Sequence, residues 1–283
     1  MSTHIAPVER RFVRTAMGLR HVAMAGQGVP VLLLHQTPRS WDEYRDVLPL
    51  LGRNVQAIAM DTPGFGDSEA LAGEASIEAW AAAALATLDA LGIGTACVVG
   101  HHTGAVIALE IAAVAADRVP ALVLSSCALV DAARRAAHAG KTPIDAVERH
   151  TDGLHLRQLW QARQSLYPTG NIDLLERFVR DALRAGPMAA EGHRVVNRYH
   201  MEERLPLISC PTLVIDAVAD PHAHPSAARL AAAIVGAELH GIEGGMVPLP
   251  DQKPEAFADA ILKFFLRANV LAPAAAVITN LPR

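Results

Sequence analysis

The five residues Gly100–Gly104, which read GHHTG, decide the fold of this chain. An apolar run, residues 96–99 (ACVV), precedes them, and a helical apolar run, residues 105–112 (AVIALEIA), follows. A buried strand, a tight turn bounded by glycines and a helix together make a sharp turn that exposes its central side chain. Such a turn usually carries a serine nucleophile, whereas here its centre is His102. The pattern therefore predicts the scaffold of a catalytic turn without its usual nucleophile.

Short apolar runs alternate with helical patterns on both sides of this turn. The mostly apolar runs of strand length are residues 29–34, 55–60, 121–125 and 211–215. Their continuous apolar character is typical of strands buried on both faces. Helical spacing connects them, as from Ser76, a candidate N-cap, to Leu91. The alternation predicts an α/β fold, with a mostly parallel sheet covered by helices on both faces.

The pattern changes between about residues 129 and 205. No strand-like run appears there, while leucines and other apolar residues recur at helical spacing. We therefore expect a helical cap, residues 129–205, inserted into a core formed by residues 1–128 and 206–283. The tail, residues 272–283, shows no pattern that assigns it a structure or a role.

Composition excludes several classes of protein. The chain has 283 residues and is 51% hydrophobic, which suits a globular protein with a sizeable core. Its net charge is -4 and no run of Lys or Arg occurs, which argues against nucleic-acid binding. No apolar stretch reaches a membrane-spanning length, and no signal peptide is visible at the start. The three cysteines cannot all pair and have no zinc-site spacing, so we expect reduced thiols in a cytoplasmic protein.

The sequence also bears on cofactors and partners. Gly64 and Gly66 lie in a loop and lack the third glycine of a dinucleotide-binding fingerprint. We therefore expect neither NAD nor FAD, and no other cofactor. The expected partner is a small-molecule substrate or ligand, with no nucleic acid and no membrane, and a homodimer is left open.

Four landmarks, in this order and at this spacing, resemble the α/β-hydrolase superfamily. They are His35-Gln36-Thr37-Pro38, similar to its His-Gly-x-Pro oxyanion loop; Asp61–Ser68, similar to its Asp-x-x-Gly-x-Gly-x-Ser loop; the elbow Gly100–Gly104; and Asp220-Pro221, similar to its strand-end acid. The resemblance covers about residues 29–124 and 210–266. It implies an α/β-hydrolase fold with an inserted helical cap.

Two of the three catalytic positions of that superfamily depart from its pattern. The elbow carries His102 in place of serine. The general-base histidine of the superfamily follows the last strand in a Gly-His context, but residues 244–254 contain no histidine, and His240 falls within the expected strand 238–242. A Ser-His-Asp acyl-enzyme mechanism needs both missing groups, so we exclude it here.

What remains of the site indicates a different chemistry. In the superfamily, the acid at the position of Asp220 orients the histidine that this chain lacks. We therefore expect Asp220 either to contact His102 directly or to hold a water molecule, with His102 acting as a general base or a nucleophile. The resemblance also implies an oxyanion hole made by the backbone N–H groups of Gln36 and Thr103, since a backbone donor does not depend on the side chain.

Seven further residues are candidates for the pocket: His35, Arg39, His101, Ser125, Trp160, His222 and Met246. Arg39 is a candidate anchor for a carboxylate, whereas His35 and His101 are expected to orient or pack rather than to react. Asp220, His222 and His224 alternate along the chain, so with His102 they form an alternative metal site. We nevertheless expect no metal.

These observations favour an enzyme that acts on a small molecule in a pocket between the sheet and the cap. General-base hydrolysis, and lyase or cyclisation chemistry by proton transfer, both fit His102 beside an oxyanion hole. A non-catalytic binding protein of the same fold and a metal-dependent hydrolase are the alternatives. The retained glycines of the elbow favour the enzyme, and the loss of both serine and histidine favours the binding protein.

Overall fold

The computed structural model describes residues 6–272, so residues 1–5 and all but the first residue of the tail 272–283 lie outside the described part. Eight strands form one sheet in the order β1-β2-β4-β3-β5-β6-β7-β8. Their bounds are β1 Glu9–Thr15, β2 Gly18–Ala25, β3 Pro30–Leu34, β4 Gln56–Met60, β5 Cys97–His101, β6 Leu122–Ser125, β7 Thr212–Ala217 and β8 Glu238–Ile242. Strand β2 pairs antiparallel with both β1 and β4, and the remaining pairs are parallel.

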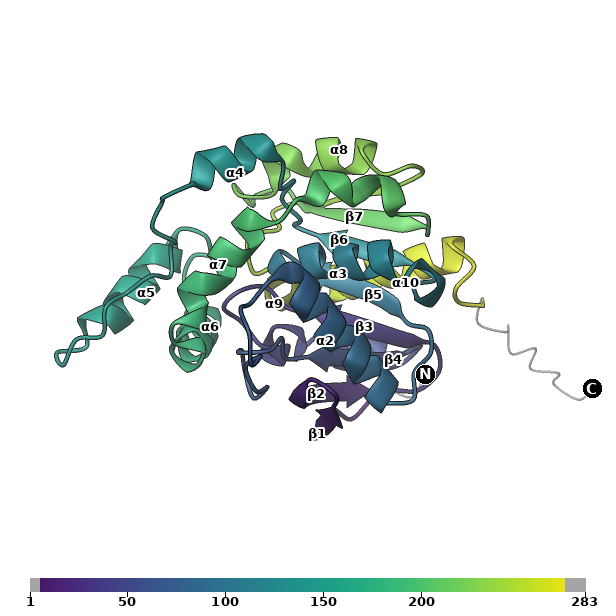
Figure 1. Cartoon of the computed structure of the whole chain (residues 1–283), viewed down its shortest axis with the longest axis horizontal. Helices are drawn as coiled ribbons and strands as arrows, with labels where there is room; N and C mark the ends of the chain where they lie inside the picture. The colour runs from purple at the N-terminus through teal and green to yellow at the C-terminus, as the bar shows by residue number, and fades with distance from the viewer. Residues whose placement is uncertain (1–5, 273–283) are drawn as a thin grey trace, which may run out of the picture.

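Helices cover both faces of this sheet (Figure 1). One face packs against α2 Ile77–Ala90, α3 Thr103–Val114 and α8 His224–Ala232, and the other against α1 Leu48–Leu51, α9 Leu249–Gln252 and α10 Pro254–Arg267. Ser76 caps α2 as expected, because its Oγ accepts the N–H of Ala79 at 3.0 Å. The mostly parallel sheet between two helical layers confirms the predicted fold class.

Residues 40–51 show helical spacing but do not form one continuous helix. The segment instead contains a 3-10 turn, η1 Trp41–Tyr44, followed by the single-turn helix α1. Pro49 explains the break, because proline has no N–H to donate and its ring clashes with the carbonyl four residues earlier in a continuous helix. Proline is tolerated in the first turn, which is where α1 places it.

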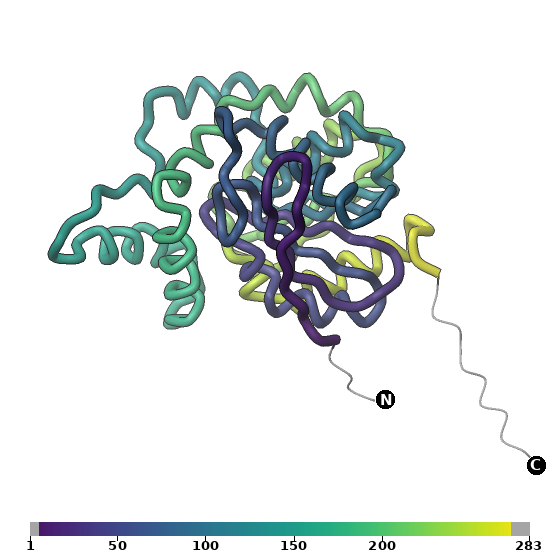
Figure 2. The backbone as a smooth tube through the Cα atoms, turned by 60° about the horizontal axis from the view of Figure 1, so that its bottom comes forward, coloured from purple at the N-terminus to yellow at the C-terminus, as the bar shows by residue number. Residues whose placement is uncertain are grey.

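Between β6 and β7 the chain is helical, with no strand among its residues 129–205. The helices are α4 Ala132–His138, α5 Leu154–Gln164, α6 Ile172–Ala185 and α7 Met188–Arg198. Short 3-10 turns complete the described elements: η2 Ala116–Arg118, η3 Met201–Glu203 and η4 Leu205–Leu207. Figure 2 shows α4–α7 as an arm in teal and green on one side of the sheet. Within residues 6–272, no helix combines the length and the apolar character needed to cross a membrane.

A buried cluster of charges joins this helical arm to the sheet. Arg39, which is fully buried, donates from Nε to Asp181 of α6 at 2.9 Å and from Nη1 to Asp251 of α9. Arg177 of α6 donates from Nε to Asp42 of η1 at 2.7 Å. Burial alone would lower the pKa of Arg39, but Asp251 and Asp181 hold it well above its ordinary value. The cluster therefore fixes α6 against the loop that follows β3.

We predict that Arg39→Leu lowers the free energy of unfolding by about 3–5 kcal/mol, the usual cost of leaving buried charges without their partner. Urea unfolding followed by circular dichroism measures the change. The matched control is Arg45→Leu, because the Arg45 side chain is 46% exposed and exposed pairs contribute only about 0–1 kcal/mol. Equal losses in the two variants would contradict a structural role for the buried cluster.

Candidate active site

The elbow between β5 and α3 has the geometry that the sequence predicts. His102 lies between the end of the strand and the first residue of the helix, with φ 47° and ψ -111°. A positive φ is strained for a residue other than glycine, and such strain gathers at functional sites. Its N–H is held by the carbonyl of Ser125 at 3.0 Å. The turn therefore presents the His102 side chain at the carboxyl end of the sheet, where parallel α/β folds bind ligands.

The two glycines of the elbow are required by close backbone contacts. A Cβ on Gly104 would lie 1.9 Å from the carbonyl oxygen of Leu34, at the end of β3. A Cβ on Gly100 would lie 2.1 Å from the carbonyl oxygen of Gly104. Both distances are far below van der Waals contact, so only glycine allows α3 to start this close to β3 and β5.

Asp220 reaches His102 from the loop after β7. Its Oδ2 lies 2.8 Å from His102 Nε2, and the carboxylate is fully buried. The two atoms are close enough for an ion pair but miss the angle of a well-formed hydrogen bond. Oδ1 accepts the backbone N–H of His222 at 2.8 Å, which fixes the carboxylate. The structure thus brings together the two residues expected to form the catalytic pair; their catalytic role stays a prediction.

The charge of Asp220 determines which ring nitrogen of His102 is free. Burial would raise the pKa of Asp220, but the His102 ring and the His222 N–H hold it well below its ordinary value. An ionised carboxylate only accepts hydrogen bonds, so Nε2 is the protonated nitrogen beside it. In the neutral ring, Nδ1 then carries the lone pair. His102 is therefore arranged to accept a proton at Nδ1.

The prediction that the backbone N–H of Gln36 belongs to an oxyanion hole is wrong. Its backbone N–H donates to Glu43 Oε2 at 2.9 Å, and its side-chain Nε2 donates to Glu43 Oε1 at 2.5 Å. The buried carboxyl group of Glu43 therefore occupies the donor that the resemblance assigned to the hole. Gln36 does line the cavity, but through its side chain rather than as a free backbone donor.

Thr37 and Thr103 offer the backbone donors instead. The Thr37 N–H makes only a long bond, 3.3 Å, to Thr103 Oγ1. Thr103 is the first residue of α3, and the first N–H groups of a helix have no partner within it. Both residues line the cavity beside His102. The sequence contained Thr37 in the right loop, but nothing in it indicated that Glu43 would occupy the neighbouring N–H.

His101 and Ser125 support the elbow from inside the core rather than lining the pocket. His101 Nε2 donates to the carbonyl of Val247 at 2.9 Å, and its Nδ1 lies 3.0 Å from Ser125 Oγ. Burial, with the nearby His102, lowers the pKa of His101 well below its ordinary value, so the ring is neutral. Its ring packs edge-on against that of His102, with centroids 4.7 Å apart. This geometry agrees with the packing role expected for His101. The prediction that Ser125 lines the pocket is wrong, because Ser125 is not among the residues of the lining.

Four other pocket candidates also lie away from the cavity. His35 is buried, with Nδ1 donating to the carbonyl of Gln36 and Nε2 accepting the N–H of Thr62. Arg39 cannot anchor a substrate carboxylate because its guanidinium is used in the buried cluster. Trp160 lines a separate hollow beside Pro168, and Val247 takes the place in the lining expected for Met246. Sequence spacing did not separate these residues from the lining because it does not fix side-chain direction.

The metal site drawn from Asp220, His222 and His224 does not assemble. His222 lines the cavity beside His102, and burial lowers its pKa. His224, however, turns away and binds Asp216 through Nδ1 at 2.8 Å. In the part of the chain that the structure describes, the ligand-type side chains that gather are His21 of β2 with Asp61 and Asp67 of the loop after β4. Asp61 there holds its own loop, accepting the N–H groups of Trp41 and Asp67.

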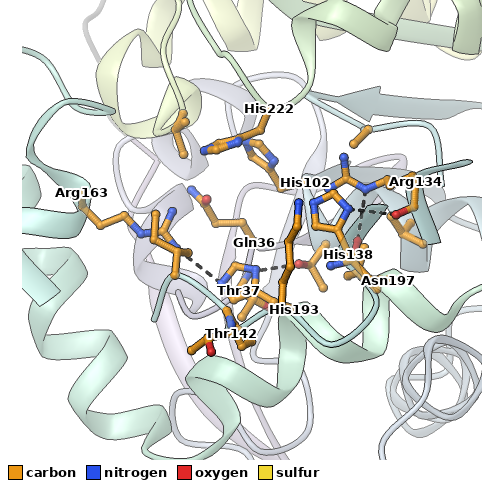
Figure 3. A pocket seen from close by; sticks show the side chains of 18 residues that line it. Gln36, Thr37, His102, Arg134, His138, Thr142, Arg163, His193, Asn197 and His222 are labelled. Atoms are coloured by element: carbon orange, nitrogen blue, oxygen red, sulfur yellow. Dashed lines mark hydrogen bonds between the residues drawn. The ribbon is translucent and has the colours of Figure 1, made fainter. Parts of the chain in front are cut away.

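The cavity itself lies between the sheet and the helical arm, with a volume of about 220 Å³ (Figure 3). The sheet side contributes Gln36, Thr37, His102, Thr103, His222 and Val247. The helical side contributes Arg134, His138, Lys141, Arg163, His193 and Asn197, among others. None of these residues of the helical side is among the seven pocket candidates predicted from the sequence. Their shared signal, an excess of basic side chains between residues 134 and 197, is visible in the sequence.

Arg163 and His193 are held by one buried acid. Arg163 Nε donates to Asp145 Oδ1 at 3.0 Å, and His193 Nε2 donates to Asp145 Oδ2 at 2.7 Å. Burial opposes these charges, yet Arg163 and His193 keep the pKa of Asp145 below its ordinary value. At this part of the helical wall, the charge of Arg163 is therefore paired with that of Asp145.

The chain is similar to known proteins both in sequence and in fold. The profile of the "Alpha/beta hydrolase family" matches residues 31–260. The chain is 39% identical over 106 residues to epoxide hydrolase 3 of Siraitia grosvenorii, which covers 36% of this chain and 34% of that protein. It is 27% identical over 267 residues to a putative non-heme haloperoxidase of Mycobacterium phage D29, and this match covers 88% of this chain and 93% of that protein. The enol-lactonase of Burkholderia xenovorans LB400 has the same fold, with a TM-score of 0.74 at 20% identity over 90% of this chain and 99% of that one.

The buried Glu43 predicts how stability depends on pH. Burial raises the pKa of Glu43 from 4.5 to about 8, against the opposing charge of Arg39. The folded protein therefore keeps a proton that the unfolded chain loses, so this contribution to the free energy of unfolding falls as the pH rises through that range. Glu43→Gln removes the titration while its amide oxygen still accepts from Gln36. As the pH rises through this range, we expect the free energy of unfolding of the variant to increase relative to that of the wild type by up to about 1.4 kcal/mol per pH unit.

Urea unfolding of both proteins across this pH range measures the effect. Glu255→Gln, at an exposed position of α10, is the matched control and should follow the wild type. Parallel pH profiles for the wild type and Glu43→Gln would show that Glu43 is ionised throughout and that the raised pKa is incorrect.

Proposed function

The chain belongs to the alpha/beta hydrolase family, and on this premise we propose that it is an enzyme that uses His102 as a general base on a small molecule. The observation that carries the proposal is the placement of His102 at a strained turn, with Nε2 2.8 Å from a buried Asp220 and the ring beside the cavity. A base needs a partner that stabilises its protonated form. Asp220 supplies that partner directly, without the intervening histidine of the usual triad.

The proposed step is a proton transfer at Nδ1. His102 removes a proton from a water molecule or from the substrate, and the imidazolium that forms is stabilised by the ionised Asp220 beside Nε2. His101 stays neutral and keeps the ring of His102 in place, because its own nitrogens are used by Val247 and Ser125. The His102 side chain is only 15% exposed, so bulk water competes little for the proton-accepting position.

Negative charge that develops on the substrate oxygen would be held by the N–H groups of Thr37 and Thr103. Preorganised backbone donors of this kind stabilise an oxyanion without reorganising during the reaction. This arrangement fits two reaction classes: hydrolysis by a base-activated water, and elimination, retro-aldol cleavage or cyclisation by proton transfer. Both need one base and one oxyanion site, and neither needs a nucleophilic serine.

A non-catalytic binding protein is the second candidate. The elbow has no serine and residues 244–254 contain no histidine, so the family's covalent mechanism is lost. In addition, the family's usual oxyanion donor is occupied by Glu43. A binding protein would keep the cavity and its basic lining but would turn over no substrate.

We predict that His102→Ala lowers the turnover of an activated ester, a lactone or a β-hydroxycarbonyl compound by about two to four powers of ten, the usual value of a positioned general base. Asp220→Asn should lower it less, since the amide keeps an oxygen for the His222 N–H but removes the charge beside Nε2. Steady-state kinetics with the purified chain measures both, and His102→Asn serves as a second variant because asparagine tolerates positive φ.

His240→Ala is the matched control, since His240 is exposed on β8 and away from the cavity; it should keep the wild-type rate. Unchanged turnover in His102→Ala would remove His102 from the mechanism. Ligand binding without turnover of any compound in the three classes would favour the binding protein.

A further inference from the structure

The helical wall of the cavity is basic, although the chain as a whole is acidic. Arg134, Lys141 and Arg163 line the cavity, and no Asp or Glu appears among the described lining residues. The buried Asp145 pairs with Arg163, which leaves Arg134 and Lys141 as the lining cations that form no ion pair with a described carboxylate. The net charge of the chain is -4, so the positive sign is local to the cavity. A concave site lined by one sign of charge attracts ligands of the opposite sign.

Arg134 has no carboxylate partner among the described residues. The nearest acid along the chain, Asp131, caps the start of α4 by accepting the Arg134 backbone N–H at 2.9 Å. The carboxylate of Asp131 also binds Arg229 at 2.8 Å, so it is used elsewhere. Arg134 is half-buried, and burial lowers its pKa. Asp131 and Asp220 oppose this shift only through their charge, without an ion pair to the guanidinium. A partly buried guanidinium that no carboxylate pairs directly is stabilised by an anion at this position.

The contacts of Arg134 leave one edge of its guanidinium free. Nε donates to Asn197 Oδ1 of α7 at 3.2 Å, and His138 Nδ1 donates to the Arg134 carbonyl at 2.9 Å. Neither Nη1 nor Nη2 finds an acceptor among residues 6–272. Figure 3 shows Arg134, His138 and Asn197 together on the opposite side of His102 from Arg163. Two parallel N–H groups in one plane match the two oxygens of a carboxylate.

The rest of the lining is suited to an apolar body. Val106, Ala128, Ile144, Val196 and Val247 line the same cavity. A ligand with a charged end and an apolar part would thus satisfy both the guanidinium and the aliphatic side chains. A volume of about 220 Å³ restricts it to a small molecule.

We propose that the cavity binds a small organic carboxylate, whose carboxylate is paired with Arg134 while its reacting group lies beside His102. This inference rests on the proposed function, because it names the substrate class of the same site. The guanidinium is a positioning group in this scheme: it fixes the substrate and does not take part in the proton transfer.

Benzoate and benzamide, which share size and shape but differ in charge, test the proposal by isothermal titration calorimetry with the full chain. We expect the wild type to bind benzoate more tightly than benzamide. Arg134→Gln should weaken benzoate binding by about tenfold or more, the usual effect of losing a hydrogen bond to a charged group, and should leave benzamide unchanged. Arg134→Lys should restore part of the preference, since it keeps the charge but not the planar pair of donors.

Arg157→Gln is the matched control. Arg157 is exposed on α5 and away from the cavity, and its substitution changes the net charge by the same amount as Arg134→Gln. It should bind benzoate like the wild type. Equal binding of benzoate and benzamide by the wild type, no benzoate binding up to its solubility limit, or an equal loss in Arg157→Gln would overturn the proposal. Tighter binding of inorganic phosphate than of benzoate would also overturn it, since the cavity would then recognise charge without an organic body.

His102→Ala separates this proposal from the proposed function. The variant should keep the benzoate preference, because the carboxylate site does not involve the base. A preference that depends on Arg134, in a protein that turns over nothing, would support the carboxylate site and contradict the catalytic proposal. Turnover that depends on His102, without any preference for benzoate, would support the catalytic proposal and contradict the carboxylate site.

Discussion

The close approach of backbone at the turn between β5 and α3 is the constraint on which the site depends. Gly104 lies against the carbonyl of Leu34 and Gly100 against the carbonyl of Gly104, with no room for a Cβ at either position. This contact places the start of α3 beside the end of β3. It also brings Thr103 next to Thr37 and forces His102 into a positive φ. The close backbone packing thus places Thr37, Thr103 and the His102 ring side by side at the cavity.

At this turn the chain has His102 where the superfamily that it resembles carries serine, and His102 lies beside Asp220. In a Ser-His-Asp triad, a histidine lies between the acid and the serine, so the acid does not contact the serine directly. Here the longer imidazole spans that gap and contacts Asp220 directly. Val247, in the segment where the family carries its histidine, offers only a carbonyl, and His101 binds it.

Buried charge shapes the site in two separate ways. The cluster around Arg39 is internally paired and binds α6 to the loop after β3, which closes the helical arm over the sheet. Glu43, next to Arg39 in that loop, takes up the backbone donor of Gln36. Arg134 differs from Arg39 because no described carboxylate forms an ion pair with it. Paired charges hold the structure, whereas an unpaired charge at a cavity is available to a ligand.

The sequence by itself determined the fold and the position of the turn that carries His102, because these depend on local patterns. Apolar runs of strand length, the glycines around His102 and the helical spacing of residues 129–205 are all readable along the chain, and Asp220 follows from the order of the strands. Only the tertiary structure decided which way long side chains point. Arg39 turned into a buried cluster, His224 turned to Asp216, and Glu43 reached Gln36. These partners are distant along the chain or on another element, and their contacts depend on how loops and helices pack rather than on any sequence period.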